Sequence, residues 1–308
     1  MTTITTTPIA TSTPTSTSTP KYYLIPLESI LKRDTKSIIY ITHAMKKRGF
    51  VFVKLPDELV KQVDLVTKIM ENFFSNTTEY KEKFKKKPIF GYFGVDHKES
   101  FRLLTRTRMN EQSYPDTFDE VKKLVNQIDR IMYAISMRLA PVLFPNLSES
   151  ARKVNIPFFR SNKPWGMFDF ARYFNDGKKQ GLSCEEHYDP GLLSFSIRST
   201  EEGLELKDEF NKWVRVPSDK NVAVLWAGKA ANDINPQITP GVHRVKCDNN
   251  GKPRMSMWHE ICTEAQEHKE LTKDEKQTIA SIYESSSGIP FSKSPGIAYF
   301  KSLAKPGI

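Results

Sequence analysis

Cysteine is scarce in this chain, and a long apolar run is missing altogether. The 308 residues include three cysteines, Cys184, Cys247 and Cys262, and no two of them form a C-x-x-C pair. This spacing gives no disulfide framework and favours a reducing compartment. No apolar run approaches the length that crosses a bilayer. We therefore expect a cytoplasmic protein without a membrane partner.

The first twenty residues lack charged side chains and consist almost entirely of Thr, Ser and Pro. Such a composition cannot bury enough apolar surface to fold, so we interpret residues 1–20 as a disordered tail. A plastid transit peptide is the minority alternative, because those segments usually carry Arg and this one has none. The missing apolar segment disfavours a secretory signal.

Acidic residues are outnumbered, with 36 against 46 Lys and Arg and a net charge of +10. A basic balance can indicate nucleic-acid binding. The densest basic run, residues 81–87, has few aromatic neighbours, however, and no nucleic-acid recognition module is visible. We expect a basic surface that attracts anionic small molecules, no nucleic-acid partner, and a monomer.

The hydrophobic pattern changes from a helical to a strand period in the middle of the chain. Region 21–160 predicts helices at 35–48, after Pro56 to 74 and at 118–139, with short strands at 22–27 and 50–53. Region 161–285 predicts short strands, at 168–174, 192–197, 203–206, 213–216, 222–226 and 254–262, then a helix at 272–283. Residues 286–308 form a loose end. This order indicates an α+β fold with a double-stranded β-helix, or jelly-roll, core and flanking N-terminal and C-terminal helices.

Within the strand-rich half, two histidines and one aspartate have the spacing of a metal site. His187 and Asp189 are two residues apart, so their side chains would share one face of a strand, and His243 follows 56 positions after His187. Two imidazoles and one carboxylate leave half of an octahedron open, as in non-haem Fe(II) oxygenases. A zinc hydrolase could use the same three ligands.

Arg254 and Ser256 repeat the same-face spacing eleven positions after His243. Arg254 offers a planar fork for a carboxylate, and Ser256 adds a hydroxyl to the same target. A metal site beside a carboxylate clamp indicates a cosubstrate with one end on the metal and the other on Arg254. A zinc hydrolase has no evident need for such a clamp.

At this point the sequence resembles the 2-oxoglutarate/Fe(II)-dependent dioxygenases of the isopenicillin-N-synthase-like type, over roughly residues 22–285. The resemblance rests on five blocks in order: His187-Tyr188-Asp189, Gly203 to Leu206, Trp213 to Pro217, Gly241 to Val245 and Arg254-Met255-Ser256. It implies that His187, Asp189 and His243 hold Fe(II) and that Arg254 and Ser256 bind 2-oxoglutarate. The implied cofactors are Fe(II), 2-oxoglutarate and O2, with ascorbate as an optional addition.

The resemblance also assigns further residues to the site. Tyr173 lies fourteen residues before His187, where the family has an aromatic segment at the 2-oxoglutarate site. Arg106 lies in a region that approaches the substrate in the family. Arg172 and Phe195 are our other candidates for substrate contacts, with plain core the alternative for Phe195. The segment 228–237 departs from the family pattern at the pocket mouth, so the identity of the substrate does not transfer.

We therefore expect an enzyme that oxidises a C–H bond of a small molecule by hydroxylation, desaturation or oxidative cyclisation, with release of succinate and CO2. The arginines at 102, 106, 108, 172 and 198 favour an organic acid or an amino-acid-derived substrate. Three alternatives stay open. They are an iron oxidase that does not use 2-oxoglutarate, a non-catalytic metabolite-binding jelly roll, and an enzyme that modifies nucleic acid or protein.

Overall fold

The computed structural model describes residues 22–86, 90–105, 113–145, 166–178, 180–248 and 250–262. Its elements, in chain order, are β1 (Leu24–Pro26), α1 (Leu27–Leu31), α2 (Thr35–Lys47), β2 (Phe50–Lys54), α3 (Asp57–Phe74), α4 (Thr78–Glu82), β3 (Lys85–Lys86), β4 (Phe90–Val95), β5 (Lys98–Leu104), η2 (Asp116–Phe118), α5 (Asp119–Leu143), β6 (Gly166–Tyr173), β7 (Leu182–His187), β8 (Leu193–Ser199), β9 (Leu204–Lys207), β10 (Trp213–Arg215), β11 (Val222–Ala227), α7 (Lys229–Ile234), β12 (His243–Lys246) and β13 (Arg254–Ile261).

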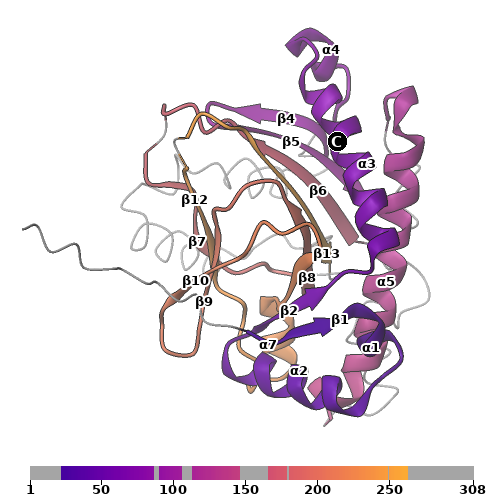
Figure 1. The fold of residues 1–308 in the computed structure, drawn as a ribbon, viewed down its shortest axis with the longest axis vertical. Coiled ribbons are helices and arrows are strands. Elements are labelled where there is room, and N and C mark those ends of the chain that lie inside the picture. The colour runs from indigo at the N-terminus through magenta and orange to yellow at the C-terminus, as the bar shows by residue number, and fades with distance from the viewer. Residues whose placement is uncertain are drawn as a thin grey trace, which may run out of the picture.

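The strands form two sheets that face one another (Figure 1). The large sheet has the order β1-β2-β11-β8-β13-β6-β5-β4-β3, and the small sheet has the order β10-β9-β12-β7. All neighbouring strands are antiparallel except β1 and β2, which are parallel. The two sheets form the jelly roll that the strand pattern predicted.

Helices cover the outer face of the large sheet, away from the small sheet (Figure 1). Phe168 and Phe170 of β6, together with Leu193, Phe195 and Ile197 of β8, are buried in the same apolar cluster as residues of α1, α2, α3 and α5. Burial of an aromatic or aliphatic side chain of this size contributes roughly 1.5–3 kcal/mol. This outer core therefore holds the large sheet in place behind the site.

A second, smaller core fills the space between the two sheets. It contains Phe52, Tyr173, Leu206, Trp226 and Val245, which come from both sheets. Because side chains alternate across a strand, the residues next to these in sequence face outward. The interior of the jelly roll is therefore apolar over much of its surface.

Local signals in the sequence explain where α2 begins and ends. Asp34 caps the helix by accepting hydrogen bonds from the backbone N–H of Ser37 (2.9 Å) and from its hydroxyl (2.8 Å). Gly49 follows the helix with a φ of 80°, where a side chain is strained. A Cβ at Gly49 would also lie 2.9 Å from the backbone nitrogen of Gly241. Gly49 thus permits the chain to turn into β2 directly beside the segment that leads to His243.

The N-terminal region is continuous with the jelly roll, because β1 to β5 belong to the same large sheet as β6, β8, β11 and β13. The predicted division between residues 160 and 161 lies outside the described residues, as do the predicted tail at 1–20, the helix at 272–283 and the loose end at 286–308. Among the described helices, none has the length and apolar character needed to span a membrane.

Candidate metal and cosubstrate site

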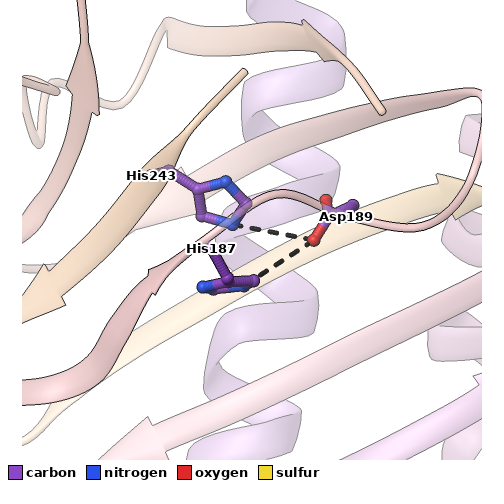
Figure 2. A group of neighbouring side chains, drawn as sticks. All are labelled: His187, Asp189 and His243. Carbon is purple, nitrogen blue, oxygen red and sulfur yellow. Dashed lines mark ion pairs between the residues drawn. The ribbon is translucent and has the colours of Figure 1, made fainter. Parts of the chain in front are cut away.

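His187, Asp189 and His243 converge at one end of the small sheet (Figure 2). His187 is the last residue of β7 and pairs directly with His243, the first residue of β12. Asp189 Oδ1 lies 3.8 Å from His187 Nε2 and 3.6 Å from His243 Nε2. One ligand atom from each residue lies within 4.8 Å of the other two. These three atoms can hold a single metal ion.

One predicted detail of this cluster is wrong. The spacing predicted that His187 and Asp189 lie on the same face of one strand, but β7 ends at His187 and Asp189 lies in the loop that follows. The loop directs the carboxylate, since the backbone carbonyl of Asp189 accepts a hydrogen bond from Lys229 N at 2.7 Å. Convergence of the two side chains therefore depends on a loop conformation and not on strand alternation.

Each proposed ligand is held by an atom that does not face the metal position. Asp189 Oδ2 accepts hydrogen bonds from the Ser194 hydroxyl and from Trp226 Nε1 (2.9 Å). The Nδ1 atoms of the histidines lie 2.7 Å from Glu185 O in the case of His187 and 2.9 Å from Gly241 O in the case of His243. When Nδ1 donates to a carbonyl, Nε2 presents its lone pair to the centre of the cluster. Such second contacts orient metal ligands and raise their affinity.

The charges of the cluster shift the pKa values of its members. Burial raises the pKa of the Asp189 carboxyl, but the two histidines and the hydrogen bonds from Ser194 and Trp226 together outweigh this effect and hold that pKa below its ordinary value. Burial and the neighbouring His187 lower the pKa of His243 to about 4. Burial would also lower the pKa of His187, but Cys184 and Asp189 raise it to about 10. The negative charge of Asp189, which favours a proton on His187, would also favour a divalent cation between the three side chains.

Arg254, Ser256 and Tyr173 lie on the interior face of the large sheet, as predicted for a cosubstrate site. Arg254 pairs with Tyr173 and Ser256 with Ala171 across β13 and β6. Arg254 is 2% exposed, and its guanidinium carbon lies 5.2 Å from the centre of the Tyr173 ring. Its Nε donates to Glu201 O (3.2 Å), while its buried Nη1 has no hydrogen-bond partner among the described residues. Buried guanidinium nitrogens usually have a partner, so Nη1 is suited to a carboxylate that enters the barrel.

The structure tests the predicted role in substrate contact for Arg172 but not for Arg106. Arg106 lies outside the described residues. Arg172 faces away from Tyr173, because it is the next residue on β6. Its Nη1 lies 3.2 Å from Glu99 Oε1 and donates to Phe74 O, on the helix side of the sheet. A role for Arg172 in substrate contact is therefore wrong for this structure.

Phe195 and Arg198 also face the helices. Phe195 is fully buried in the outer core, so it does not line the interior of the barrel and the core alternative holds. The register between β8 and β13 shifts near Met257 and Trp258, and this irregularity directs Arg198 outward to Asp64 of α3, at 3.4 Å. Neither residue can serve the site from that side of the sheet.

Sequence reasoning missed four polar residues on the interior face. Ser194 and Trp226, which hold Asp189, are register partners on β8 and β11. Lys98 and Asp169 lie on β5 and β6, and the register brings both onto the face that carries Tyr173. Their only signal in the sequence is alternation, for example Ser194-Phe195-Ser196, which cannot name the partner strand. Prediction of these four residues would have required knowledge of which distant strands pair in the sheet.

Comparisons with known proteins agree with this geometry. A family model described as the 2OG-Fe(II) oxygenase superfamily matches residues 167–263. These residues form a 2OG-Fe(II) oxygenase domain. The domain begins at β6 and ends just after β13, and it contains the His187, Asp189 and His243 cluster together with Arg254 and Ser256. The prediction of the superfamily is confirmed, whereas the isopenicillin-N-synthase-like subfamily stays a prediction.

Two Arabidopsis thaliana proteins match part of this chain. One is named 2-oxoglutarate-dependent dioxygenase AOP2 and is 33% identical over 81 residues, which is 26% of this chain and 18% of that protein. The other is named "Probable inactive 2-oxoglutarate-dependent dioxygenase AOP2", with the same identity over 26% of this chain and 20% of that protein. The chain thus matches about a fifth of the length of these relatives.

Solved structures extend the likeness of the fold beyond the oxygenase domain. The dioxygenase for auxin oxidation 1 from A. thaliana, in complex with 2-oxoglutarate, has a TM-score of 0.63 at 18% identity, over 78% of this chain and 92% of that one. Full-length Neurospora crassa T7H in complex with alpha-KG has a TM-score of 0.63 at 17% identity, over 78% and 84%. This coverage is larger than that of the family match, so the likeness of fold extends beyond residues 167–263.

Proposed function

We propose that this protein is an Fe(II)- and 2-oxoglutarate-dependent oxygenase that oxidises a C–H bond of a small molecule. The observation that carries the proposal is a pairing of two features in one barrel. His187, Asp189 and His243 converge with each ligand held by a second contact, and the buried Arg254 guanidinium presents a nitrogen that no described residue pairs with. A zinc hydrolase would account for the first feature but not for the second.

The residues have distinct tasks in the proposed reaction. His187, Asp189 and His243 would hold Fe(II) on one side and leave the other side open. Arg254 and Ser256 would bind the distal carboxylate of 2-oxoglutarate, with Tyr173 packed beside the guanidinium. Apolar interior residues such as Leu206 and Trp226 exclude water from this space. When bound, Fe(II) with 2-oxoglutarate and O2 supplies the oxidation, in which 2-oxoglutarate is converted to succinate and CO2.

The finer features of the function are part of the proposal. The product is a hydroxylated, desaturated or cyclised form of an anionic or amino-acid-derived metabolite. Support comes from the basic net charge and from the cationic groups of β5 that face the interior. Ascorbate as an additional cofactor, a monomeric state and a cytoplasmic location complete the proposal.

The test begins with anaerobic titration of the full chain with Fe(II) and then with 2-oxoglutarate, followed by absorbance. Addition of O2 and a panel of small acids then allows succinate to be measured. Asp189→Ala should abolish both the iron–oxoglutarate complex and succinate release. His43→Ala removes an exposed imidazole of α2 and should leave both unchanged.

The same experiment separates the alternatives. Oxidation of a substrate without release of succinate would indicate an iron oxidase that does not use 2-oxoglutarate. A folded protein that fails to bind Fe(II) would indicate a non-catalytic binding protein. Either result would overturn the proposed function.

A further inference from the structure

The interior face of β5 and β6 carries four polar residues that the proposed iron and 2-oxoglutarate sites do not use. This polar ladder consists of Lys98, Ser100, Arg102 and Asp169. Lys98 pairs with Tyr173, Ser100 with Ala171 and Arg102 with Asp169. Directly paired residues of neighbouring strands share a face. The same face continues into β13, where Arg254 and Ser256 pair with Tyr173 and Ala171, and the three strands are neighbours in Figure 1. The ladder therefore lies beside the cosubstrate residues.

Asp169 has an acceptor that nothing in the described chain uses. The residue is fully buried, and its Oδ2 receives both donors of Arg102, Nε at 2.7 Å and Nη2. Its Oδ1 is buried and has no hydrogen-bond partner among the described residues. An unsatisfied buried acceptor costs about 1–3 kcal/mol, and a structural ion pair would more simply use both oxygens against the guanidinium fork. The free oxygen is what a binding site for a hydrogen-bond donor would retain.

Lys98 supplies the complementary charge. Its ammonium lies 5.6 Å from the centre of the Tyr173 ring, and no described residue accepts a hydrogen bond from it. Burial lowers its pKa, but Tyr173, Cys184 and Asp169 outweigh burial and raise the pKa above its ordinary value. Lys98 is therefore a cation that faces the barrel interior, and its three donors have no acceptor among the residues that the structure describes.

We propose that Lys98 and Asp169 form the substrate-recognition pair of this enzyme. Lys98 binds an acidic group of the substrate, and Asp169 Oδ1 accepts a hydrogen bond from an N–H or O–H group of the same molecule. The substrate class is then a small carboxylic acid that also carries a hydrogen-bond donor, as an amino acid or a hydroxy acid does. The inference rests on the proposed function and specifies its substrate.

Tyr173 lies against both Lys98 and Arg254, which gives Lys98 a second possible binding partner. The Tyr173 ring contacts the Arg254 guanidinium at 5.2 Å and the Lys98 ammonium at 5.6 Å. Arg254 and Lys98 are therefore neighbours, and Lys98 could in principle bind 2-oxoglutarate instead of the substrate. The two roles are separable, because the affinity for 2-oxoglutarate would depend on Lys98 only if Lys98 bound 2-oxoglutarate.

The experiment uses the full chain with Fe(II) and 2-oxoglutarate under anaerobic conditions, with probe binding measured by calorimetry. The probes are matched sets built on alanine, leucine, phenylalanine and glutamate. Each set contains the amino acid, the hydroxy acid in which a hydroxyl replaces the amine, the acid that lacks both, and the amino amide that lacks the carboxylate. In at least one set we expect the acid with a donor to bind about tenfold or more tightly than the two truncated forms.

Variants then assign the contacts. Asp169→Asn replaces the free acceptor by an amide and should remove the preference for the donor. Lys98→Met should remove the preference for the carboxylate, and Lys98→Arg should retain it. Lys54→Met, which removes an exposed lysine of β2 in the same sheet, should change neither preference. Retention of the iron–oxoglutarate complex by each variant establishes that it is folded.

Three results would overturn the inference. The first is that no set shows the preference although wild type forms the iron–oxoglutarate complex. The second is that the preferences persist in Asp169→Asn and Lys98→Met. The third is that Lys98→Met weakens 2-oxoglutarate binding, which would assign Lys98 to the cosubstrate. If wild type forms no iron–oxoglutarate complex, the proposed function fails first and the inference falls with it.

Discussion

At the scale of single residues, the metal cluster is defined as much by what holds the ligands as by the ligands. Asp189 would be free to rotate in its loop if Oδ2 were not held by Ser194 and Trp226. The Trp226 ring also packs on His243, with 4.9 Å between ring centres. Trp226 therefore positions two of the three ligands without touching the metal position.

Replacement of Trp226 by Phe tests this positioning role. Trp226→Phe keeps an aromatic ring beside His243 but removes the hydrogen bond to Asp189. We expect the affinity for Fe(II) to fall about 10- to 100-fold, the usual effect of losing such a contact. Competition with a chromophoric chelator measures the affinity. Trp213→Phe, on β10 at the far edge of the small sheet, is the control, and an unchanged affinity in Trp226→Phe would contradict the prediction.

Arg254 permits a second prediction at this scale. Arg254→Met keeps much of the buried volume but removes the nitrogens suited to a carboxylate. Loss of hydrogen bonds to a charged group should raise the KM for 2-oxoglutarate roughly 10- to 100-fold, while Fe(II) affinity stays the same. Arg215→Met, which removes an exposed arginine paired with Glu202, should have no effect on KM. A parallel loss of Fe(II) affinity would instead indicate general damage to the barrel.

At the scale of elements, buried polar contacts attach the helices to the back of the large sheet. Asp129 of α5 accepts a hydrogen bond from the Thr105 hydroxyl (2.7 Å) and lies 3.2 Å from His259 Nε2 on β13. His259 is fully buried and faces away from Ser256, so its role is structural. This contact joins α5, the end of β5 and β13.

Asp129→Leu should therefore destabilise the protein without a direct effect on the site. The substitution leaves the Thr105 hydroxyl and His259 without this buried partner, and we expect the free energy of unfolding to fall by about 2–4 kcal/mol. Urea denaturation measures the change. Asp119→Ala, on the same helix but 75% exposed, should lower it by less than about 1 kcal/mol. Equal effects of the two variants would refute the importance of the buried contact.

Elements were predictable from the sequence where one local signal sufficed. The 3.6-residue period located α2, α3 and α5, and alternation located β6 and β13 to within a few residues. The irregularity that directs Arg198 outward, and the end of β7 before Asp189, could not be predicted, since both depend on hydrogen bonds between distant strands. The three candidate metal ligands could be selected from the sequence because two histidines and one aspartate at this spacing are an uncommon combination. The residues that hold them, such as Ser194, are chemically ordinary.

At the scale of the whole molecule, the oxygenase domain is not an independent unit. The family match covers residues 167–263, yet β2 pairs with β11 and β5 pairs with β6 within one continuous sheet. The outer face of that sheet packs on helices from the N-terminal region. The sequence suggested two regions because its pattern changes, whereas the tertiary structure joins them.

A fragment of residues 166–262 should therefore fail to fold. It would expose the Phe168, Phe170 and Phe195 side chains that the helices cover, and it would leave the edges of β6 and β11 unpaired. Loss of an apolar face at roughly 25 cal/mol per Å² exceeds the few kcal/mol by which domains are stable. We expect no cooperative thermal transition, no near-ultraviolet circular dichroism and strong binding of an apolar dye. The matched control is the fragment 22–262, which retains those helices and strands and should unfold cooperatively. Cooperative unfolding with Fe(II) binding by the shorter fragment would refute the dependence of the oxygenase domain on the N-terminal region.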